Sequence, residues 1–140
     1  MRDYRLISAD SHVTEPPTVW ADRMLVLAEG DCSWLPYVKE QTVDRLNRIH
    51  PDTRPKMKLM PSAYFAKNIF TTYITDHYGV QQRHGVGVSQ MMWSSDYPHT
   101  GTHWPNSWKV IEKDYEGVDE DERRQILAGN AARIYGFGKS

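Results

Sequence analysis

The chain has 140 residues, of which 39% are hydrophobic and 25% are charged, and this balance is typical of one globular domain covering residues 1–140. Seventeen basic residues against eighteen acidic residues give a net charge of −1, which excludes a strongly basic nucleic-acid-binding protein. Because the chain has a single cysteine, no signal peptide and no apolar run of membrane-spanning length, we expect a cytoplasmic protein without disulfide bonds or a membrane partner.

Strand-like and helix-like segments alternate along the chain. Runs of β-branched, aromatic or continuously apolar residues predict strands, and apolar residues at helical spacing predict helices. In chain order we expect a strand over 4–13, a strand over 24–30, a helix over 34–49, a loop over 50–61, a short helix capped by Ser62, a strand over 68–75, a helical turn and loop over 78–87, a strand over 90–95, a helix over 106–115 capped by Asn106, and a helix over 119–134 that ends before Gly136.

This alternation predicts an α/β fold with a parallel sheet. The run over 24–28 is continuously apolar, which is typical of a strand buried on both faces. Ligands bind at the edge where parallel strands end. Polar residues follow each predicted strand there, namely Asp10 and His12, then Glu29, then Thr75 or Asp76, and finally Asp96.

Two of these groups have the composition of a metal site. Asp10 and His12 are two residues apart, so on a strand both side chains face the same way and offer one carboxylate and one imidazole to a divalent cation. Asp96 can bind a metal or accept a proton, or it can simply begin a turn before Pro98. Glu29 can act as a general base or metal ligand, or its carboxylate can cap the backbone amides of residues 30–33.

The remaining reactive side chains have competing interpretations. His99 and His103 follow Asp96 closely and can serve as metal ligands or substrate contacts, although polar histidines are also common in loops. We expect Trp93 to lie in the core and Cys32 to be an inert packing residue.

Several segments together resemble the amidohydrolase-related proteins, in the branch that contains aminocarboxymuconate-semialdehyde decarboxylase and the resorcylate decarboxylases. Residues 7–16 (ISADSHVTEP) resemble the first-strand metal motif of that family, and residues 92–99 (MWSSDYPH) resemble its eighth-strand motif. Residues 25–38 and 64–73 are similar to the sixth and seventh strand regions, and residues 126–136 (ILAGNAARIYG) are similar to the terminal helix.

The resemblance implies a (β/α)8 barrel fold with one divalent metal, often zinc or manganese. It implies metal roles for Asp10, His12 and Asp96, and it places Glu29 where many members carry a catalytic histidine. Between Trp20 and Met24 the chain passes from the counterpart of the first strand to that of the sixth, which implies an internal deletion that includes the fifth-strand metal histidine.

A complete barrel needs about 250 residues, so we expect a partial, half TIM-like barrel of about four parallel strands. Such a half barrel exposes strand edges, which favours completion by a second copy in a homodimer or higher oligomer. The implied function is a metal-dependent hydrolase or decarboxylase of a small molecule, in which Asp96 handles the proton. The alternative is a catalytically inactive remnant that at most binds a metal or a small ligand.

Overall fold

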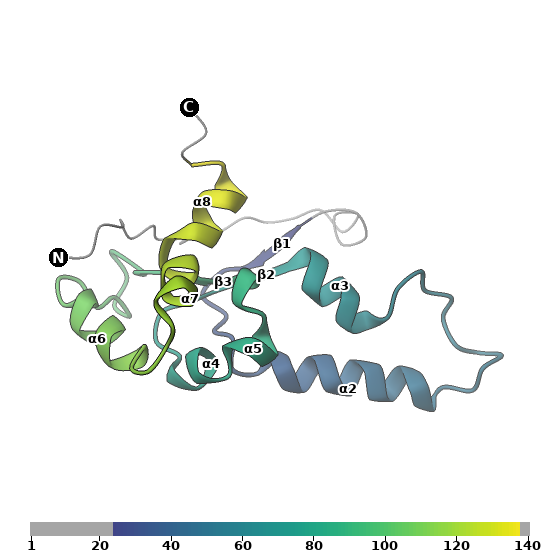
Figure 1. Ribbon diagram of the computed structural model, residues 1–140. Helices are drawn as coiled ribbons and strands as arrows, with labels where there is room; N and C mark the ends of the chain where they lie inside the picture. The colour runs from purple at the N-terminus through teal and green to yellow at the C-terminus, as the bar shows by residue number, and fades with distance from the viewer. Residues whose placement is uncertain (1–23, 138–140) are drawn as a thin grey trace.

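Three short strands form the centre of the molecule. The computed structural model describes residues 24–137, so the expected strand over 4–13, with Asp10 and His12, lies outside the described residues. β1 (Leu25–Leu27), β2 (Ile69–Tyr73) and β3 (Met91–Trp93) pair in the order β1-β2-β3, and both pairings are parallel (Figure 1). The predicted parallel α/β sheet is therefore confirmed, and its three described strands end at one common edge.

The connections are mostly helical, as the alternation predicted. In chain order they are α2 (Leu35–Arg48), α3 (Pro61–Asn68), α4 (His77–Gln81), α5 (Arg83–Val86), the 3-10 helix η1 (Val88–Gln90), α6 (Ser107–Asp114), α7 (Glu120–Arg124), the π-helical turn η2 (Gln125–Gly129) and α8 (Asn130–Tyr135). The last three elements together occupy the single helix expected over 119–134. None of the described helices has the length and apolarity required to cross a membrane.

The helix ends agree with the sequence in part. Asp119 caps α7 by accepting the backbone N–H groups of Asp121 and Glu122, and Gly136 ends α8 with a φ of 74°. The Ser62 cap is wrong, because α3 already begins at Pro61, whose missing N–H and fixed φ suit a first helical position. Asn106 occupies the N-cap position of α6 but forms no side-chain capping bond.

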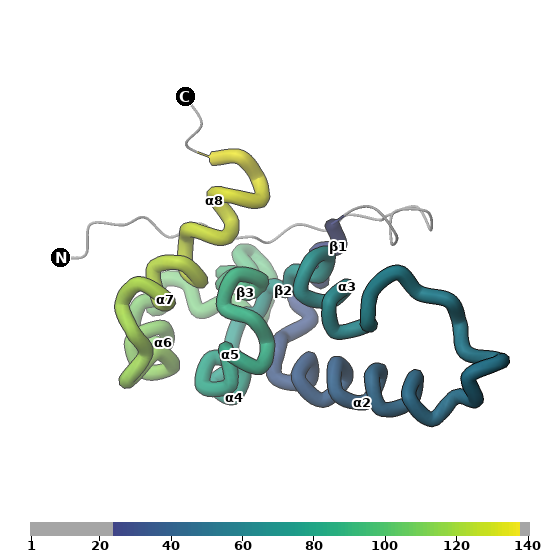
Figure 2. Tube along the Cα trace, turned by 45° about the vertical axis from the view of Figure 1, so that its right-hand side comes forward, coloured from purple at the N-terminus to yellow at the C-terminus, as the bar shows by residue number. Residues whose placement is uncertain are grey.

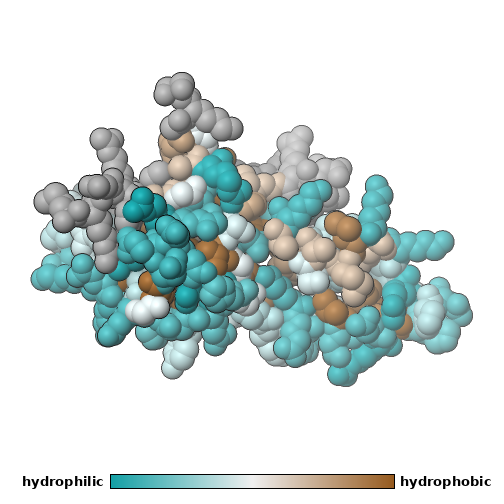
Figure 3. Space-filling view, in the orientation of Figure 1, coloured by the Kyte–Doolittle hydropathy of each residue, from teal (hydrophilic) through white to brown (hydrophobic). Residues whose placement is uncertain are grey.

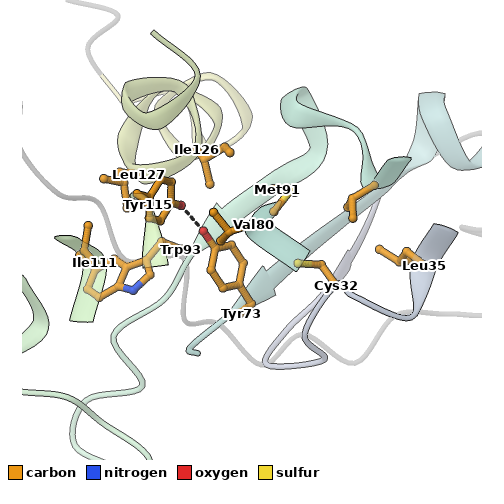
Figure 4. Packing of buried hydrophobic residues seen from close by; sticks show 11 residues of the cluster. Cys32, Leu35, Tyr73, Val80, Met91, Trp93, Ile111, Tyr115, Ile126 and Leu127 are labelled. Atoms are coloured by element: carbon orange, nitrogen blue, oxygen red, sulfur yellow. Dashed lines mark hydrogen bonds between the residues drawn. The ribbon is translucent and has the colours of Figure 1, made fainter. Parts of the chain in front are cut away.

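The core lies on both faces of β2 and β3. On one face Tyr73, Met91 and Trp93 pack with residues of α4, α5, α6 and η2, and the Tyr73 hydroxyl is hydrogen-bonded to the Tyr115 hydroxyl (Figure 4). On the other face Phe70 and Met92 pack against α8. This alternation follows from the two-residue period of a strand. Trp93 and Cys32 are buried, as expected, at 4% and 0% exposure.

β1 and α2 are less well covered than the rest. All three residues of β1 are only half-buried, so the expectation of a strand buried on both faces is wrong. β3, the other edge strand of the described sheet, is buried because η2 and α8 pack against it, whereas the main contacts of β1 are with β2. Of the fourteen residues of α2, Leu35 alone is buried. Figure 2 shows α2 and α3 extending side by side away from the sheet. The predicted homo-oligomer stays a prediction.

Candidate metal centre

Three ligand-type side chains converge at the edge where the strands end. Glu29 follows β1, and Asp96 and His99 follow β3; one ligand atom from each lies within 4.8 Å of the other two. His99 Nδ1 is 2.8 Å from Asp96 Oδ1 and 4.0 Å from Glu29 Oε1. The structure thus brings together the two candidate residues from different strands, Glu29 and Asp96.

The backbone turns sharply at both carboxylates. Glu29 and Asp96 each have a φ of 53°, in the left-handed region that residues other than glycine rarely adopt. The turn at Glu29 is held by its N–H, which donates to Thr72 Oγ1 of β2 at 2.7 Å. The turn at Asp96 is closed by the His99 N–H, which donates to the Asp96 carbonyl oxygen at 2.7 Å. Unusual backbone held by specific contacts is common at functional sites.

Asp96 is the most enclosed member of the site. Its residue exposure is only 4%, whereas Glu29 is half-buried and His99 is exposed. Gly101 lies directly against its carboxylate, since a Cβ added at Gly101 would come 2.6 Å from Asp96 Oδ2. The loop after β3 therefore encloses the Asp96 carboxylate and requires a residue without a side chain at position 101.

A second carboxylate, Asp76 after β2, has a structural role. Its Oδ2 accepts the backbone N–H groups of Cys32 and Ser33, each at 2.7 Å, and its Oδ1 accepts the Gly79 N–H at 2.8 Å. Burial alone would raise the pKa of Asp76, but these donors outweigh it and hold the pKa below its usual value. The capping of these amides, considered for Glu29, is thus performed by Asp76.

Two further contacts join residues that follow β2 and β3. The Thr75 hydroxyl is hydrogen-bonded to His103 Nε2, and the rings of Tyr97 and Trp104 meet edge to face at 6.2 Å. Burial, with the nearby charge of Asp76, raises the pKa of the Cys32 thiol, which agrees with an inert cysteine.

The structure also separates the two histidines that the sequence left equivalent. His99 lies in the cluster with the carboxylates, and His103 is not part of it. The spacing in the sequence could have favoured His99 over His103. A histidine three residues after Asp96 falls within the turn closed by the hydrogen bond between the His99 N–H and the Asp96 carbonyl oxygen.

Two carboxylates and one imidazole are ligands suited to several divalent cations, including zinc and manganese. Donors that share one such cation at about 2.1 Å lie roughly 3–3.5 Å from one another. The two distances measured from His99 Nδ1, 2.8 Å and 4.0 Å, bracket that range. The donor set and its spacing therefore fit a cation.

Comparison with known proteins gives a consistent result. A sequence model of the family described as amidohydrolase matches residues 37–137. The structure is similar to that of 5-carboxyvanillate decarboxylase from Sphingomonas paucimobilis, with 25% identity, a TM-score of 0.62, and coverage of 81% of this chain and 33% of that one.

It is also similar to dihydroxybenzoic acid decarboxylase from Polaromonas sp. JS666, determined with bound manganese and the inhibitor 2-nitroresorcinol. The identity there is 20% and the TM-score 0.59, with coverage of 76% of this chain and 32% of that one. The chain thus spans about one third of the length of both decarboxylases. No protein with a curated description matches it.

Proposed function

Because the chain belongs to the amidohydrolase family, we propose that it binds one divalent cation at the strand-end edge and supports metal-dependent hydrolysis or decarboxylation of a small carboxylate. The observation that carries this proposal is the convergence of Glu29, Asp96 and His99 from the ends of two strands. In the same proposal the cation is zinc or manganese, and Asp10 and His12 add ligands from the N-terminal segment.

Each side chain of the cluster has a distinct part in the proposed chemistry. A bound divalent cation would supply a Lewis acid that polarises a substrate oxygen and lowers the pKa of water. Asp96 accepts or returns the proton, because its carboxylate is enclosed and held in one orientation by the His99 ring. Glu29, which follows β1 rather than β3, offers a second carboxylate to the same space.

The first experiment measures metal bound by the full chain after purification without chelators. We expect about one zinc or manganese per chain, and loss of that metal in the Asp96→Asn and His99→Ala variants. The matched controls are Asp114→Asn, which changes another buried aspartate, and His103→Ala, which changes the neighbouring histidine; both should keep the metal. A chain without metal, or equal metal in all variants, would refute the proposed site.

The second experiment tests turnover. The metal-loaded chain is incubated with 5-carboxyvanillate and with dihydroxybenzoic acids, the compounds named for the two structural neighbours, and release of CO₂ is measured. We expect release that depends on both added metal and Asp96.

A second candidate function is favoured by one fact, which is that the chain spans about one third of the length of these decarboxylases. In that case the chain is an inactive member that retains a metal site. Stoichiometric metal lost in Asp96→Asn, together with no turnover of any carboxylate tested, would select this second candidate.

A further inference from the structure

A large groove lies between α2 and α3, away from the candidate metal centre. Its volume is about 1340 Å³. Leu46 and Ile49 line it from α2 and its end, Met57 and Leu59 from the connecting segment, and Phe65 from α3. Figure 3 shows apolar surface gathered in this part of the molecule. Apolar side chains from α2, the connecting segment and α3 therefore make up most of the lining of the groove.

Within the part of the chain that the structure describes, this surface lacks a covering element. Tyr37 is 63% exposed, Met57 is 44% exposed and Leu59 is 43% exposed, and all three line the groove. Soluble monomers rarely leave a contiguous apolar patch of this kind uncovered, and such patches mark sites of interaction. Among the described residues, the apolar face of α2 is thus only partly covered, by α3 and α5.

The charges around the groove have one sign. Four cationic side chains line it, and no acidic residue does; the cations are Arg45, Lys56, Lys58 and Lys67. The acidic residues of α2 lie elsewhere, since Asp44 pairs with Arg48 at 2.9 Å and lines a separate shallow surface with Glu40. The apolar floor and cationic rim are complementary to a ligand that is apolar in the middle and acidic at its sides.

The size of the groove indicates the kind of ligand. Pockets for small molecules usually have volumes of about 300–1000 Å³, and this groove is larger. The residues of α2 and its end that line the groove run from Tyr37 to Ile49, a rise of about 18 Å at 1.5 Å per residue, so a helix of roughly twelve residues, or three turns, matches the length of the groove. Amphipathic helices bind in such grooves through apolar residues spaced three and four apart.

We propose that the groove between α2 and α3 docks an amphipathic α-helix of about three turns, supplied by another protein, whose apolar face is flanked by acidic residues. A second copy of this chain meets the charge requirement poorly. A two-fold dimer through the groove would bring two sets of the four cationic side chains together, and like charges in contact oppose association.

The test uses the full chain and two fluorescein-labelled peptides of fifteen residues. Both carry leucines at positions i, i+3, i+4 and i+7; one has glutamates flanking the leucines and the other has lysines at the same positions. Fluorescence anisotropy should show that the glutamate peptide binds at least tenfold more tightly than the lysine peptide. Its affinity should fall as salt is raised, because the flanking contacts are electrostatic.

The groove itself is tested with the double variant Lys56→Glu/Lys58→Glu. Both lysines are exposed, so the change should leave the circular dichroism spectrum unaltered while weakening the glutamate peptide at least tenfold. The matched control, Lys109→Glu/Lys113→Glu on α6, makes the same charge change away from the groove and should bind as the unaltered chain does.

Two results would overturn the proposal. One is equal binding of the two peptides, or none, at concentrations up to 100-fold above the protein. The other is a combination of two observations: the glutamate peptide does not bind, and light scattering shows a dimer that is altered in Lys56→Glu/Lys58→Glu. A second copy of the chain would then occupy the groove. Neither result bears on the metal content of the chain, so this proposal and the proposed function fail separately.

Discussion

The region around β2 and β3 and the region around α2 and α3 contain similar apolar residues in different surroundings. Met91, Ile126 and Leu127 are fully buried, because helices cover both faces of these strands. In α2 the apolar residues repeat at helical spacing, yet only Leu35 is buried. The comparison shows that an amphipathic pattern predicts which face needs a partner, whereas the fold around it determines whether that partner is present.

Truncating one leucine in each region should give the largest difference. Leu127→Ala removes a fully buried side chain and should lower the free energy of unfolding by about 2–5 kcal/mol, because it leaves a cavity in the core. Leu46→Ala, in the half-buried face of α2, should cost less than half as much. Urea denaturation of both variants measures the difference. Equal losses would mean that α2 is as well packed as the core.

Asp76 connects the loop after β1 to α4, and removing its charge should have the next largest effect. Asp76→Asn should lower the free energy of unfolding by about 2–3 kcal/mol at pH 7, since buried N–H donors lose a charged acceptor. The pKa of Asp76 is lower in the folded chain than its usual 3.8. Its contribution is therefore fully present above that pH and is lost as pH falls through the lowered folded value.

This pH dependence is measured by urea denaturation of the unaltered chain and Asp76→Asn between pH 3 and pH 7. The difference between the two should be constant above about pH 5 and shrink toward the acidic end. The exposed Glu116→Gln serves as the control and should show a difference near zero throughout. A difference that grows toward acidic pH would contradict the assigned role of Asp76.

Gly79 tests how tightly the same connection is packed. A Cβ at Gly79 would lie 2.3 Å from Cys32 Sγ and 2.7 Å from Asp76 Oδ2, so Gly79→Ala should destabilise the chain by about 1–3 kcal/mol. Gly129→Ala is the matched change, because nothing lies closer than 3.8 Å to a Cβ there and its φ is helical. That variant should be neutral or slightly more stable. Thermal unfolding of both distinguishes crowding from a general effect of alanine.

The smallest effect is expected on the exposed face of α2. Tyr37→Ser should change the free energy of unfolding by less than about 0.5 kcal/mol, because the ring is 63% exposed and has little packing to lose. Thermal unfolding of the free chain measures this change. A loss above 1 kcal/mol would show that the ring is covered in solution.

The sequence predicted best those elements that depend on residues close together in the chain. The helical spacing over 34–49 and the β-branched run over 68–75 gave α2 and β2 closely, because such patterns arise from neighbours in the chain. The Ser62 cap was wrong for a local reason, since Pro61 already suits the first position of α3.

The candidate site was harder to predict. Glu29 and Asp76 both follow strands, and the sequence does not reveal which carboxylate reaches the amides of Cys32 and Ser33. That depends on the register between β1 and β2 and on the left-handed turn at Glu29, both of which are set by contacts distant in the chain. Asp96 was one of several candidates because it follows an apolar strand, and only the resemblance of residues 92–99 to a family motif implied a metal role for it.

We propose above that Glu29, Asp96 and His99 hold one divalent cation. This proposal is tested most directly by X-ray diffraction from crystals grown with manganese, recorded at a wavelength where manganese scatters anomalously. We expect one strong anomalous peak about 2.2 Å from ligand atoms of all three residues, and its absence in crystals of Asp96→Asn. A peak away from these residues, or none in the unaltered chain, would contradict it.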